Sequence, residues 1–109
     1  MHTAQHINEI VFAGDVVKIG RWRLPAGHPH FADSGPTRHY LFVFPRTSTW
    51  IQHAGGRPFV GDPNIVTYYN ERQEYTRRAI AALGDWCDYY AVNPELLRHV
   101  VAAWDPPAA

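Results

Sequence analysis

The fold is decided by RHYLFVFPRTSTWIQHAGGRPFVGDPNIVTYYNERQEYTRR, residues 38–78 of this 109-residue chain. Within this stretch, short runs rich in β-branched and aromatic residues alternate with turn sequences such as Ala54-Gly55-Gly56 and Gly61-Asp62-Pro63-Asn64. Runs of this composition and length, bounded by Gly, Pro, Asn and Asp, are typical of β-strands joined by tight turns. The pattern predicts strands over residues 38–44, 47–53, 57–60, 65–69 and 74–80.

The segment before this stretch also has β-strand character. Residues 10–24 form two β-prone pieces separated by the turn dipeptide Gly14-Asp15, which indicates a hairpin. Residues 25–36 are rich in Gly and Pro without periodicity, and we expect a loop there. Residues 1–9 are polar and predict no regular structure.

The segment after it has the sequence GDWCDYYAVNPELLRHV over residues 84–100. Together with the few residues that follow, it predicts one more strand and one helix. Asn93 is a favourable helix cap and Pro94 suits the first helical position, so a helix should begin there after a strand over 85–92. Apolar residues recur every three or four positions, which predicts one face packed against the rest of the molecule: Leu96, Leu97, Val100, Val101 and Trp104. Asp105-Pro106-Pro107 ends the helix and begins a stiff linker.

These two stretches resemble the N-terminal cupin-like sensor domain of AraC-type transcription regulators. The resemblance spans about residues 17–100 and is most specific in FPRTSTWIQHAGGRPFVGDPN (44–64) and YYNERQEY (68–75). It implies an all-β fold, an antiparallel cupin-like barrel (double-stranded β-helix or jelly roll) with one C-terminal helix. The implied organisation of residues 1–109 is a single domain with a candidate arm (1–16), the barrel (17–92), the helix (93–104) and the start of a linker (105–109).

The resemblance also implies a function. A domain of this type senses a small organic effector, is not an enzyme, and works in the bacterial cytoplasm, with a homodimer as the candidate assembly. DNA would be contacted only through a C-terminal helix-turn-helix domain that is not in this chain. Two alternatives stay open: a metal-dependent small cupin enzyme, such as a dioxygenase or isomerase, and a free-standing cupin binding module.

Composition agrees with a small folded domain that does not itself bind DNA. Ten Lys and Arg residues balance ten Asp and Glu residues, so no basic surplus attracts nucleic acid or an anionic membrane. The single cysteine, Cys87, lies in an apolar run and is expected to be a buried small hydrophobe rather than a disulfide partner. No apolar run approaches the roughly 20 residues of a membrane span.

The histidines raise the question of a metal site. His28-Pro29-His30 has the H-x-H spacing of many metal-binding cupins, but Asp33 follows where those proteins have Glu. The second half-motif, NERQEY, offers Asn70, Gln73 and Tyr75 in place of the histidine that would complete the site. A first-row metal usually needs three protein ligands. We therefore expect no metal and no cofactor, with His28 and His30 as the ligands if the enzyme alternative holds.

A ligand site is expected inside the barrel. Large aromatic side chains offer flat stacking surfaces with a polar handle, and a histidine can hydrogen-bond a ligand. If strand alternation turns them inward, the ligand-binding residues are Trp22, His39, Trp50, Tyr68 and Tyr90. Arg46, in the family-like FPR turn, is a further candidate, whereas Arg72, Arg77 and Arg78 are expected to keep an edge strand over 74–80 soluble.

Overall fold

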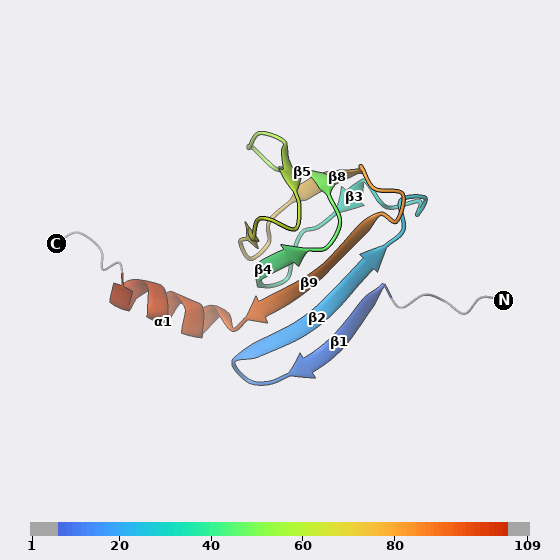
Figure 1. Ribbon diagram of the computed structural model, residues 1–109. Coiled ribbons are helices and arrows are strands. Elements are labelled where there is room, and N and C mark those ends of the chain that lie inside the picture. The colour runs from blue at the N-terminus through green and yellow to red at the C-terminus, as the bar shows by residue number, and fades with distance from the viewer. Residues whose placement is uncertain (1–6, 105–109) are drawn as a thin grey trace.

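The computed structural model describes residues 7–104, which form two antiparallel β-sheets facing each other and one C-terminal helix (Figure 1). The five-stranded sheet has the order β1-β2-β9-β4-β7, and the four-stranded sheet has the order β3-β8-β5-β6. The elements are β1 (Asn8–Ala13), β2 (Val17–Leu24), β3 (Asp33–Ser34), β4 (Tyr40–Pro45), β5 (Thr49–His53), β6 (Phe59–Gly61), β7 (Thr67–Tyr69), β8 (Tyr75–Ala79), β9 (Asp85–Val92) and α1 (Pro94–Trp104). The expected all-β antiparallel barrel with one C-terminal helix is confirmed.

Local turn chemistry places most strands where the sequence predicted them. Gly14 donates its backbone N–H to the Val17 carbonyl and closes the β1–β2 hairpin, and Gly56 does the same to His53 between β5 and β6. Two details differ. The expected loop over 25–36 contains the short strand β3, and β8 lies between β3 and β5 instead of at a sheet edge.

Strand register sets the inner face of the five-stranded sheet. Lys18, Ala91, Leu41 and Tyr69 lie opposite one another on β2, β9, β4 and β7, and the next inner row contains Gly20, Tyr89, Val43 and Thr67. Between the sheets, a buried cluster forms the core from Val43, Ile51, Tyr69 and Cys87. Cys87 is buried and unpaired, as expected.

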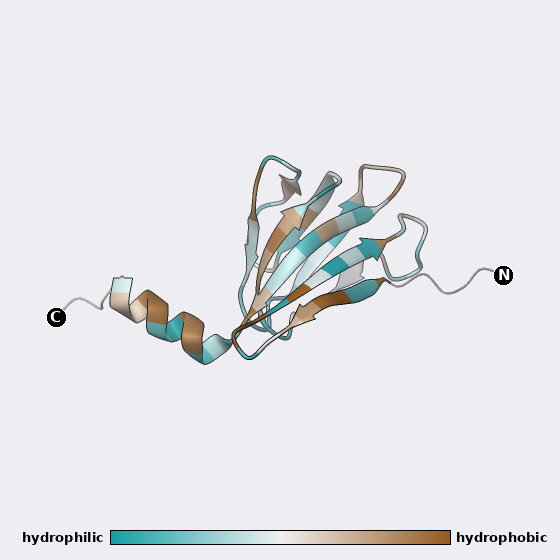
Figure 2. Ribbon diagram, turned by 60° about the horizontal axis from the view of Figure 1, so that its bottom comes forward, coloured by the Kyte–Doolittle hydropathy of each residue, from teal (hydrophilic) through white to brown (hydrophobic). Residues whose placement is uncertain are grey.

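Helix α1 begins as predicted but does not pack on the barrel. The Asn93 side-chain oxygen accepts hydrogen bonds from the backbone N–H groups of Glu95 and Leu96, which caps the helix. A single residue, Asn93, separates the helix from β9, so α1 runs on from the strand and extends away from the sheets (Figures 1 and 2).

The expectation that one helix face packs against the molecule is therefore wrong for this structure. None of the eleven helical residues is buried, and the apolar side chains Leu96, Val100, Val101 and Trp104 are exposed. Among residues 7–104, no helix is long and apolar enough to cross a membrane.

Candidate ligand-binding site

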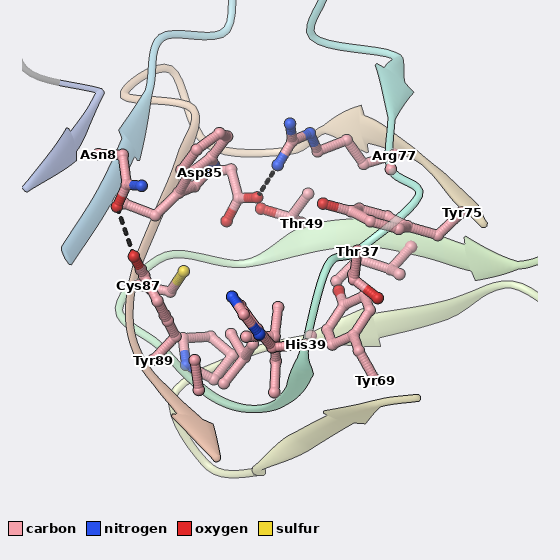
Figure 3. Close-up of a pocket in the computed structure, with 18 of the residues that line it drawn as sticks. Asn8, Thr37, His39, Thr49, Tyr69, Tyr75, Arg77, Asp85, Cys87 and Tyr89 are labelled. Atoms are coloured by element: carbon pink, nitrogen blue, oxygen red, sulfur yellow. Dashed lines mark hydrogen bonds and ion pairs between the residues drawn. The ribbon is translucent and has the colours of Figure 1, made fainter. Parts of the chain in front are cut away.

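A cavity of about 500 Å³ lies between the two sheets (Figure 3). Inward-facing residues of both sheets form its wall, because side chains alternate between the two faces of a strand. The five-stranded sheet contributes Lys18, Trp22, Leu41, Val43, Tyr69, Asp85, Cys87, Tyr89 and Ala91, and the four-stranded sheet contributes Thr49, Ile51, Gly61, Tyr75 and Arg77.

A buried ion pair forms one end of the cavity. The Arg77 side chain is only 4% exposed, and its Nη1 lies 2.6 Å from Oδ2 of Asp85. Its Nε donates a hydrogen bond of 2.8 Å to the Phe31 carbonyl oxygen. The guanidinium also lies within 6 Å of the ring centroids of Trp22, Phe31 and Tyr75. These contacts fix the guanidinium in one position.

The ion pair is a neutral unit in an apolar setting. Burial raises the pKa of Asp85, and the neighbouring Arg77 opposes that rise. A buried ion pair recovers its desolvation cost only when its geometry and additional hydrogen bonds are good. Here Phe31 supplies one such bond. Because each charge is matched by the other, this end of the cavity offers no surplus charge to a ligand.

Neutral groups form the middle of the cavity. Val43 and Ile51 are apolar, and burial raises the pKa values of Tyr69 and Cys87, so both stay protonated at neutral pH. Two further lining atoms, Trp22 Nε1 and Thr49 Oγ1, are buried without a hydrogen-bond partner among the described residues. Buried polar atoms usually have a partner, so these two are free hydrogen-bonding capacity in the wall.

The opposite end has a different chemistry. Lys18, Arg38 and His39 line it, and Figure 3 shows the His39 imidazole pointing into the cavity. Strand β1 reaches the lining nearer the ion pair, where Asn8 is opposite Trp22 and its Oδ1 accepts a hydrogen bond of 2.6 Å from the Tyr89 hydroxyl. Burial raises the pKa of Tyr89, and the bond to Asn8 opposes that rise.

The structure separates the five residues expected to contact a ligand. Trp22 and His39 line the cavity, and their contact with a ligand stays a prediction. Trp50, Tyr68 and Tyr90 lie on the outer faces of their strands and are 38%, 39% and 41% exposed, which corrects the expectation that they turn inward. Their smaller neighbours face inward instead, among them Thr49 and Ile51 on β5.

The other candidate residues also lie away from the cavity. His28 and His30 are adjacent in the loop after β2, with ring centroids 5.9 Å apart, and neither lines the cavity. Among the side chains that the structure describes, no three or more of His, Cys, Asp or Glu are placed together to hold a metal. Arg46 is exposed and pairs with Asp88 at 2.8 Å on the outer face.

Two central residues of the site were not singled out from the sequence. Arg77 was assigned to an exposed edge strand, but β8 is an inner strand and the Arg77 side chain is buried. Asp85 was treated only as the start of a strand. Their spacing could have indicated that they face inward. Arg77 is two residues from Tyr75, and Asp85 is two residues from Cys87, so the members of each pair share a strand face.

Comparison with known proteins identifies the fold. No family model and no curated protein matches the chain. Among solved structures, the chain is similar to an RmlC-like cupin family protein with a double-stranded β-helix fold from Methanocaldococcus jannaschii, with a TM-score of 0.63, 14% sequence identity, and 84% of each chain covered. A protein from Neisseria meningitidis also matches, with a TM-score of 0.57, 12% identity, and coverage of 79% of this chain and 82% of that one. The chain therefore has the cupin double-stranded β-helix fold.

Proposed function

We propose that this cupin fold binds a small organic effector in its cavity and is the sensing domain of an AraC-type transcription regulator. The observation that carries the binding part is the cavity itself, whose volume of about 500 Å³ falls in the range of small-molecule sites. Its wall combines apolar side chains with a few fixed polar groups, which is the usual composition of such sites.

The regulatory part rests on the sequence resemblance over residues 44–64 and 68–75 and on how the cavity wall connects to both ends of the chain. Asn8 on β1 lines the cavity, and so do Tyr89 and Ala91 near the end of β9, only a few residues before α1. A ligand that contacts these residues differently in two arrangements of β1 or α1 would shift the population between them. A downstream DNA-binding domain could respond to that shift.

A matched pair of variants on β4 tests ligand binding. Leu41 lines the cavity, whereas Phe42 is the next residue and points to the outer face. Leu41→Trp should fill part of the cavity and weaken binding of any effector found in a thermal-shift screen, while Phe42→Trp should leave binding unchanged. Equal effects of the two variants would contradict binding inside the barrel.

A chimera tests the regulatory part. We would fuse this chain to the DNA-binding domain of an AraC-type regulator and measure a reporter gene with and without the effector. Expression should depend on the effector in the Phe42→Trp chimera and lose that dependence in the Leu41→Trp chimera. Binding without any effect on expression would favour the free-standing binding module.

A further inference from the structure

Charge is distributed unevenly between the cavity and the rest of the chain. The whole chain has a formal net charge of zero. Among the described residues, the cavity wall contains the cationic side chains Lys18, Arg38 and Arg77 against the single carboxylate of Asp85, a surplus of two positive charges. A charged wall of low dielectric attracts ligands of the opposite sign more strongly than the same charges on an open surface.

This surplus lies at one end of the cavity. Lys18 is opposite Ala91 in the β2–β9 pairing, whereas Asp85 lies six residues earlier on β9. Six residues of a strand span about 20 Å, so the Asp85 carboxylate is about two Debye lengths from Lys18 at physiological salt. Arg38 directly precedes His39 and β4, whose first residue, Tyr40, is opposite Val92 at the same end of β9.

The two cations at this end have no carboxylate partner among the described residues. Arg21, Arg46 and Arg77 each have a carboxylate within 4 Å. Neither Lys18 nor Arg38 has such a partner within the part of the chain that the structure describes. Lys18 is half-buried on the inner face of β2, in the row that lines the cavity, and Arg38, which also lines the cavity, is exposed. The half-buried His39 adds a hydrogen-bonding group beside them.

We propose that the effector is a small organic carboxylate whose anionic group lies against Lys18 and Arg38 and whose apolar body lies along the wall formed by Val43, Ile51 and Tyr69. This inference rests on the proposed function and specifies its ligand class. The reverse orientation is disfavoured, because a carboxylate at the other end would compete with Asp85 for Arg77 and leave a buried carboxylate unpaired.

Matched probes test the charge requirement. We would measure binding of benzoate, cinnamate and indole-3-acetate, each beside its neutral amide of nearly the same shape, by isothermal titration calorimetry. The carboxylates should bind about tenfold more tightly than the amides, because charge-assisted hydrogen bonds are about twice as strong as neutral ones. Raising the salt concentration should weaken binding of the carboxylates and not of the amides.

Variants locate the anionic group. Lys18→Gln and Arg38→Gln should each weaken carboxylate binding severalfold, the double variant should remove the preference over the amide, and Lys18→Arg should retain it. Arg57→Gln, in the exposed turn between β5 and β6, is the control and should change nothing. Melting temperatures of all variants check that the barrel is intact.

The outcomes separate this inference from the function on which it rests. Amides that bind as tightly as carboxylates, with no effect of Lys18→Gln or Arg38→Gln, would overturn the assignment of an anionic effector and leave effector binding standing. If none of the probes of either kind binds, the carboxylate assignment is overturned, and the proposed function then depends on the wider thermal-shift screen with Leu41→Trp and Phe42→Trp.

Discussion

The two faces of the five-stranded sheet differ in a way that the sequence conceals. The outer face has a row of large apolar residues that lie opposite one another on four strands: Tyr68, Phe42, Tyr90 and Ile19. The neighbouring inner rows contain smaller residues such as Thr67, Gly20 and Ala91. Large rings stabilise the sheet from outside through cross-strand contacts, and small residues inside leave the space for a ligand. Ring size alone does not mark the outside of this barrel, because the rings of Trp22, Tyr69 and Tyr89 line the cavity.

The ion pairs show the same contrast. Arg77–Asp85 lies on the inner side with side chains 4% and 13% exposed, whereas Arg46–Asp88 lies on the outer side with side chains 62% and 28% exposed. Similar distances thus correspond to very different surroundings, and the free energies of unfolding of suitable variants can measure the difference.

The largest expected effect is on the inner ion pair. Arg77→Met should destabilise the protein by about 3–5 kcal/mol in chemical denaturation at neutral pH, because Asp85 is left buried and unpaired. The matched outer variant, Arg46→Met, should cost less than about 1 kcal/mol. The Arg77→Met penalty should shrink at acidic pH, where Asp85 becomes protonated. Similar penalties for the two variants would remove the distinction between the faces.

Adjacent tyrosines on β7 compare the faces directly. Tyr69 is 5% exposed in the core cluster, and Tyr68 is 39% exposed with its ring 5.1 Å from that of Phe42. Tyr69→Ala should cost about 3 kcal/mol, the low end for a buried ring because it already borders a cavity. Tyr68→Ala should cost about 1 kcal/mol or less, the size of a cross-strand pair. Equilibrium unfolding of both variants in urea measures this difference.

Two threonines that line the cavity differ in whether their hydroxyl groups have a hydrogen-bond partner. The Thr37 hydroxyl donates to the Asn70 carbonyl at 2.6 Å and accepts from the Gln73 N–H at 3.0 Å, whereas the Thr49 hydroxyl has no partner among the described residues. Thr37→Val should destabilise by about 1 kcal/mol because it removes two part-buried hydrogen bonds. Thr49→Val should be neutral or stabilising by up to about 1 kcal/mol. Thermal unfolding of both variants checks the pair, and a large loss from Thr49→Val would show that its hydroxyl is bonded.

The smallest expected effect is the contribution of His53 to the pH dependence of the free energy of unfolding. His53 lies against the rings of Phe59, Tyr69 and Tyr75, and burial lowers its pKa below the usual 6.5. The unfolded chain then binds this proton more readily, so the free energy of unfolding should fall as the pH drops through about 6.5 and level off below the folded-state pKa. His53→Asn should flatten this part of the stability–pH profile. An unchanged profile would place the imidazole in solvent.

The fold was largely predictable because local signals were strong. The turn at Gly14-Asp15, the glycines at 55 and 56 and the Asn93 cap each act within a few residues, and the structure has them as expected. Which face of each strand points into the barrel was not predictable. Tyr40, Phe42 and Phe44 alternate with Leu41 and Val43 on β4, so both faces are apolar and the two-residue period gives no direction. The role of Arg77 depends on Asp85 in another strand, a pairing that exists only after the sheets face each other.

Gly20 has a consequence for how such a site could evolve. The Tyr89 ring occupies the space that a side chain at position 20 would fill, because a Cβ atom there would overlap that ring. A single change to alanine would push Tyr89 aside and reshape the cavity while leaving the ladder of β2 and β9 intact. One codon in β2 could thus alter the size of molecule that the barrel admits, and relatives with the same strands could differ in the compounds to which they respond.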